Sequence, residues 1–305
     1  MQMKWNKEKQ SEEQIRPTKK KKFKLDKEAV ERIEAEFDDR DLSGYTNYDV
    51  YDEQEYEKPK RKFIRKLIVR VVIICLIVLL INVIILFATG QIWFNEPKKR
   101  DYPVRGPIIT QDMGKINWDK FSQQNIQMAY IRATKSTTFE DESFKSNWKN
   151  SGNTDLPVGA LHIFDFGMDG TAQAKHFCET VGNKTSGRLI PAVQVKLYGF
   201  YTFFPSNYVD VTKRLNDFIK YIKDYYGVYP IIMCNSRTYN KYIEGNFEEC
   251  PLWIESLFSK IDENINWTFW GYTNKTRFSF YENNHEYLYM TAFNGDEEAF
   301  KKLIM

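Results

Sequence analysis

The segment IPAVQVKLYG, residues 190–199, indicates both a strand and a site. Its apolar run begins after a proline and ends at a glycine, which is typical of a short buried strand. Because side chains alternate along a strand, Gln194 and Lys196 point to one face and the valines between and before them to the other. Two polar side chains on one face of a buried strand predict a cleft at that face.

Strands and helices alternate on both sides of this segment. We expect strands at 128–132, 157–166, 191–197, 229–235, 252–255 and 268–272, and helices at 144–151, 171–181 and 209–226. This order predicts an α/β domain with a parallel sheet closed into a TIM-like (β/α) barrel. The C-terminal ends of barrel strands form the mouth where chemistry takes place. The polar residues expected there are Lys135, Asp165, Gln194, Lys196, Asn235 and Glu255.

Residues 67–94 predict a single transmembrane helix. The stretch from Val71 to Ala88 is apolar apart from Asn82, and about 20 such residues span a bilayer. Seven basic residues lie between 58 and 70, and fewer follow the span, so the positive-inside rule places the N-terminus in the cytoplasm. The basic flank argues against a core helix of a soluble protein. The late start of the segment argues against a cleaved signal peptide.

The remaining segments are a polar tail and a linker. Residues 1–62 are too polar and charged to bury a core, and are expected to be mostly disordered, with one short helix at 26–38. Residues 95–104 read as a linker, and the barrel domain as 105–305. The net charge of +3 does not indicate nucleic-acid binding. Cys178, Cys234 and Cys250 could form one disulfide or remain three thiols.

Several short motifs after residue 105 resemble those of glycoside hydrolase family 25, the lysozyme (N-acetylmuramidase) family. They are GKINW (114–118), YIRAT (130–134), FKSNW (144–148), LPVGALH (156–162), YG (226–227) with PII (230–232), PLWI (251–254), WGYT (270–273) and FNG (293–295). They occur in the family's order and spacing, over about 105–305. The resemblance implies a barrel-like fold with a groove for peptidoglycan glycan strands.

The same resemblance implies that the catalytic carboxylates are missing. The family's Gly-Ile-Asp-Val-Ser is replaced by GPIIT (106–110), and its Asp-x-Glu strand by QVK (194–196). Glycoside hydrolysis needs a proton donor and negative charge near the developing cation, which an amide and ammonium groups do not supply. We therefore predict a pseudoenzyme. The degenerate positions are Ile108, Gln194, Lys196, Tyr289 and Thr291, and Lys135 replaces a further Glu.

Two functions follow from these residues. The first is a non-catalytic domain, anchored in a bacterial cytoplasmic membrane with the barrel on the periplasmic or extracellular side. It would bind peptidoglycan glycan or a protein partner, within an envelope complex. The alternative is an active cell-wall hydrolase with relocated acids, Asp165 or Glu255. A third option is that the tail before Arg61 carries the function and the barrel serves as its anchor in a larger assembly. No metal or cofactor is expected. Groove candidates are Lys135, His162, Tyr198, Tyr201, Phe203, Trp253 and Trp270, although aromatic residues in a barrel are more often core.

Overall fold

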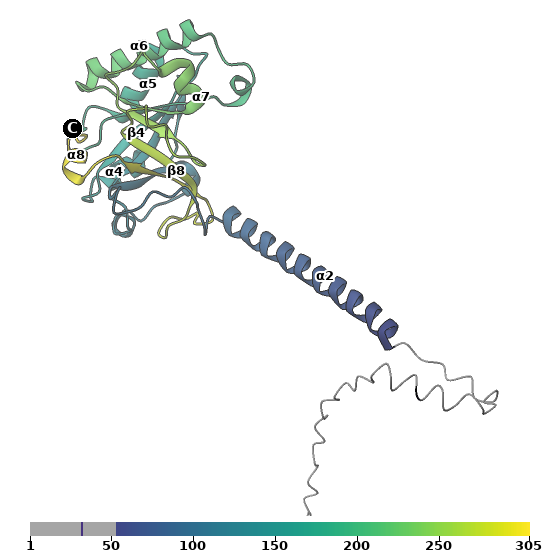
Figure 1. The fold of residues 1–305 in the computed structure, drawn as a ribbon. Helices are drawn as coiled ribbons and strands as arrows, with labels where there is room; N and C mark the ends of the chain where they lie inside the picture. The colour runs from purple at the N-terminus through teal and green to yellow at the C-terminus, as the bar shows by residue number, and fades with distance from the viewer. Residues whose placement is uncertain (1–31, 33–52) are drawn as a thin grey trace, which may run out of the picture. The chain divides into compact units, whose positions relative to one another are not determined.

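The computed structural model describes Arg32 and residues 53–305 (Figure 1). The helix predicted at 26–38 lies outside the described residues apart from Arg32, which is helical. The chain divides into two units, residues 1–72 and 73–305, and the barrel belongs to the second.

The apolar segment forms one helix, α2 (Glu53–Ala88). Its portion Lys60–Ala88 is long and apolar enough to cross a membrane, and is the one such helix in the part of the chain that the structure describes. We predicted the span to continue to residue 94, but the helix ends at Ala88. The chain turns at Gly90, whose φ of 70° favours glycine, and a Cβ there would overlap the backbone of Lys275.

Eight strands close into a barrel in the order β1-β2-β4-β5-β6-β7-β8-β9 and back to β1. They are β1 (Arg105–Ile109), β2 (Ala129–Lys135), β4 (Val158–Ile163), β5 (Ala192–Val195), β6 (Ile231–Asn235), β7 (Leu252–Glu255), β8 (Phe269–Thr276) and β9 (Leu288–Phe293). The short β3 (Phe139–Glu140) pairs outside the ring with β2. The predicted strands are confirmed. The TIM-like expectation needs correction, because β9 is antiparallel to both neighbours.

Helices cover the outside of the barrel. They are α3 (Trp118–Phe121), α4 (Phe144–Ser151), α5 (Gly170–Val181), α6 (Tyr208–Tyr226), α7 (Ser236–Thr238) and α8 (Glu297–Lys301), with short helical turns at Gln111–Met113, Gly199–Thr202 and Tyr239–Ile243. Figure 1 shows α5 and α6 side by side outside the strands. In α6 the buried residues recur at helical spacing, from Val211 through Leu215 to Ile222. The Asn207 side chain accepts a hydrogen bond from the Val209 amide at its start.

The core has two layers, one inside the barrel and one beneath the helices. Alternation along the strands sends Tyr130, Met233 and Trp253 into the interior. The opposite strand face packs against the helices, where Phe177 and Phe218 are buried. Both faces of the strands are therefore apolar, which explains why the sequence shows apolar runs rather than strict alternation.

Residues 91–104, which include the predicted linker, pack on the barrel. The Trp93 indole donates to the Tyr272 carbonyl at 2.7 Å, and the Asn95 amide donates to the Ser256 carbonyl at 2.8 Å. The Arg105 side chain is buried and hydrogen-bonds the carbonyls of Tyr102 and Pro97. This segment acts as part of the domain, because it satisfies backbone carbonyls on β8 and directly after β7.

Candidate functional site

The mouth is formed where β4 to β7 end. Strand register pairs Ile163 with Gln194, and Asn235 with Glu255. An ion pair joins Lys196, just after β5, to Glu255 at the end of β7. Gln194 and Lys196 are half-buried while Val193 and Val195 are buried, as the predicted alternation requires.

The centre of this mouth is the ion pair between Lys196 and Glu255. Lys196 Nζ lies 2.6 Å from Glu255 Oε1, and the side chains are 42% and 10% exposed. The ammonium group neutralises the carboxylate and occupies one of its oxygens. A carboxylate paired in this way supplies little net negative charge to a developing sugar cation.

Tyr289 reaches the same place from β9. Its hydroxyl is buried beside Glu255, and no described group meets it with hydrogen-bond geometry. Burial raises its pKa well above the usual value, and the charge of Glu255 raises the pKa further, so the phenol stays neutral. Gly271 on the neighbouring strand makes room for it, because a Cβ at that position would lie 1.7 Å from the Tyr289 hydroxyl oxygen. An aromatic side chain therefore fills the place where the resemblance puts an acid.

A second cation lies at the end of β2. Lys135 Nζ is 4.1 Å from the centroid of the Tyr198 ring, a cation–π contact. Burial raises the pKa of Tyr198, and the nearby carboxylate of Asp165 raises it further. Asp165 itself accepts a hydrogen bond from the Gly167 amide at 2.9 Å, which shapes the turn after β4. Lys135 forms no ion pair with any residue that the structure describes.

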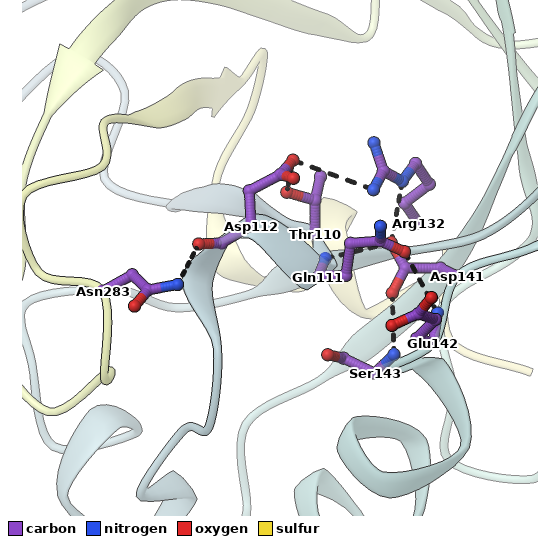
Figure 2. Close-up of polar contacts among 8 residues, drawn as sticks. All are labelled: Thr110, Gln111, Asp112, Arg132, Asp141, Glu142, Ser143 and Asn283. Atoms are coloured by element: carbon purple, nitrogen blue, oxygen red, sulfur yellow. Dashed lines mark hydrogen bonds and ion pairs between the residues drawn. The ribbon is translucent and has the colours of Figure 1, made fainter.

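A polar cluster that the sequence did not predict joins β1, β2 and α4 (Figure 2). Arg132 Nε donates to Asp141 Oδ2 at 2.7 Å, and Arg132 Nη2 lies 3.8 Å from Asp112 Oδ2. Asp141 is fully buried and also accepts from the amides of Gln111 and Ser143. These bonds satisfy both carboxylate oxygens, so the cluster fixes the loop after Ile109 against the start of α4. The one feature of the sequence that points to this cluster is Asp141, three residues before α4 begins.

Three predicted groove residues are buried away from solvent, which corrects those predictions. His162 faces the helices: its Nδ1 is 2.7 Å from Thr134 Oγ1, and its ring stacks on Phe218 at 4.9 Å. Burial lowers the pKa of His162 to about 3, so it is neutral. Trp253 lies in the barrel interior and Trp270 in the outer layer, and neither offers a free ring face to a sugar.

The remaining groove candidates follow β5. Tyr198 and Tyr201 are half-buried, with their rings 6.2 Å apart in an edge contact. Phe203 is 78% exposed. Of these candidates Phe203 is therefore the exposed one, while Lys135 lies over the Tyr198 ring.

No metal site was predicted, and among residues 32 and 53–305 no group of three or more His, Cys, Asp or Glu side chains could hold a metal ion. Cys178, Cys234 and Cys250 are buried free thiols, so of the two alternatives the structure has three thiols.

The fold is an eight-stranded α/β barrel with a polar mouth, and comparison with known proteins gives its family. The model for glycosyl hydrolases family 25 matches residues 109–280, and the chain belongs to this family. A family 25 glycosyl hydrolase structure from Bacillus anthracis is 31% identical, with a TM-score of 0.63 over 69% of this chain and 97% of that one. The domain is therefore lysozyme-like and peptidoglycan-related.

Two further relatives match parts of the chain. Lysozyme M1 of Streptomyces globisporus is 33% identical over 92 residues, which is 30% of this chain and 31% of that protein. The protein YegX of Escherichia coli O157:H7 is 23% identical over 210 residues, 67% of this chain and 74% of that protein.

Proposed function

We propose that this chain is a membrane-anchored, non-hydrolytic family member that binds peptidoglycan glycan in the cell envelope. The observation that carries the proposal is the Lys196–Glu255 ion pair at 2.6 Å, at the position where the family resemblance implies a catalytic carboxylate. Gln194, on the same face, has no titratable proton, and Tyr289 is a neutral buried phenol.

Charge explains why these substitutions oppose hydrolysis. The transition state of glycoside cleavage resembles an oxocarbenium ion, which negative charge stabilises and positive charge destabilises. The Lys196–Glu255 pair has no net charge, and Lys135 adds an ammonium group at this mouth. Asp165 is engaged in the turn after β4. Binding of a glycan needs none of these carboxylates in a catalytic role.

The surface that supports binding is the open part of the mouth. Tyr201 offers a half-exposed aromatic ring, and Lys135, which lies over the Tyr198 ring and forms no ion pair with a described residue, offers an ammonium group. Aromatic rings stack on sugars through their apolar faces, and a lysine favours ligands with carboxylates, which peptidoglycan carries.

Co-sedimentation with sacculi tests the proposal. The full chain, solubilised in mild detergent, should pellet with sacculi, and Lys135→Met should weaken pelleting several-fold. Lys149→Met is the matched control: it removes the same charge from an exposed position on α4 and should leave pelleting unchanged. Absence of pelleting would contradict glycan binding and indicate a protein partner in the envelope instead.

The alternative function is a hydrolase with relocated acids, favoured by the presence of Asp165 and Glu255 at the mouth. It predicts release of muropeptides by the wild type and loss of that release in Glu255→Gln. The option that the tail before residue 61 carries the function concerns residues that mostly lie outside those described, and stays a prediction.

A further inference from the structure

The exposed apolar side chains of the barrel domain are distributed unevenly between its two ends. Loops that follow strand C-termini carry Phe139 after β2, Met168 after β4, Phe200, Phe203 and Phe204 after β5, Phe258 after β7 and Phe280 after β8, all exposed. At the opposite end, the large exposed apolar residues of the described chain are Tyr225 and Tyr229, both with a polar hydroxyl. Exposed apolar residues gathered at one end of a domain mark a surface that contacts a ligand, a protein or a membrane.

The membrane-spanning candidate also ends at the mouth end. Gly90, two residues after α2, lies against Lys275 near the C-terminal end of β8. Further along, the Tyr102 ring contacts that of Trp267, just before β8 begins, with ring centroids 5.8 Å apart. The segment that connects α2 to β1, residues 89–104, therefore runs antiparallel to β8. It begins at the mouth and ends at the opposite end of the barrel, where β1 starts.

An aromatic cluster joins the helix end to the mouth. Phe87 and Trp93 stack with centroids 4.9 Å apart, and Phe258 lies 5.7 Å from Trp93 and 6.4 Å from Phe94. Phe94 and Phe258 are 68% and 62% exposed despite these contacts. Phe258 is three residues from Glu255, so the cluster is within about 11 Å of the mouth ion pair along the chain.

From these observations we propose that the mouth end of the barrel lies against the lipid–water interface, with the aromatic cluster and the loop after β5 seated in the headgroup region. Aromatic side chains favour this region, and exposed phenylalanines gain from contact with acyl chains. The occupant is the outer surface of the bilayer that α2 crosses, so the inference rests on the proposed membrane anchor. This orientation limits the mouth to ligands that reach the bilayer surface.

Depth-dependent fluorescence quenching tests the orientation. The full chain with Cys75→Ser would be reconstituted into phosphatidylcholine nanodiscs, some containing lipid with a nitroxide near the headgroup. A fluorophore is attached at Phe258→Cys, at Phe203→Cys, or at the control Tyr225→Cys on the far end of α6. The three remaining native cysteines are buried, and the chain without an added cysteine measures their background labelling.

We expect quenching at positions 258 and 203 to be several-fold stronger than at 225. Quenching no stronger at 258 and 203 than at 225 would overturn the inference, and quenching at 258 alone would refute contact by the loop after β5 and with it the orientation. Failure of the chain to enter nanodiscs would refute the membrane anchor itself. Weak quenching in chains that do enter would refute only the orientation.

Discussion

Replacing Lys196 with Met should destabilise the barrel through Glu255. The carboxylate is 10% exposed and loses its partner at 2.6 Å, so a nearly buried charge is left without compensation. Breaking a buried ion pair costs about 3–5 kcal/mol, whereas an exposed pair is worth about 0–1 kcal/mol. Because the lysine side is 42% exposed, we expect about 1–3 kcal/mol, or a fall in melting temperature of roughly 3–9 °C for a domain of this size.

The assay is thermal and denaturant unfolding of the full chain in detergent, followed by near-ultraviolet circular dichroism. The double variant Lys196→Met with Glu255→Gln should recover part of the loss, giving a coupling free energy of at least about 1 kcal/mol. Lys175→Met is the control, since Lys175 and Glu179 lie 3.9 Å apart on α5 and are both mostly exposed. If Lys196→Met costs no more than Lys175→Met, the reasoning about the mouth ion pair is wrong.

Three further predictions concern packing and pH. Gly271→Ala should destabilise by about 1–3 kcal/mol through overlap with Tyr289, and Tyr289→Ala in the same chain should relieve part of it; additive losses in denaturant melts would contradict this contact. Burial lowers the pKa of His162 to about 3 in the folded chain. As pH falls from 6.5 towards 3, His162 is therefore protonated in the unfolded chain but stays neutral in the folded chain. Stability should therefore fall by up to about 1.4 kcal/mol per pH unit, a slope that His162→Asn should flatten in unfolding measured across that range. Gly90→Val should release the connecting segment from Lys275 and speed its cleavage by trypsin, while equal cleavage rates would show that the close contact is not needed.

The barrel was predictable because its strands are apolar runs of the right length separated by amphipathic helices. Residues 190–199 also gave the correct shared face for Gln194 and Lys196, since alternation is a local property of the chain. The antiparallel β9 was not predicted, because strand direction depends on how the chain returns and not on the strand's own residues.

The errors at the site have one physical source. When both faces of a strand are buried, alternation separates the two faces but does not say which lies inside the barrel. His162 faces the helices and Trp253 the interior for this reason, and neither reaches the mouth. The fit of Tyr289 against Gly271 depends on strand register, which residue types alone do not fix.

Absence of hydrolysis is the central claim, and muropeptide release tests it most directly. Purified full chain would be incubated with sacculi at high molar ratio, beside an active family 25 lysozyme as positive control, and new reducing ends counted by mass spectrometry. We predict none above the level of buffer alone, with the chain still bound to the sacculi. Reducing ends that appear with the wild type and disappear with Glu255→Gln would contradict the account and establish an enzyme with a relocated acid.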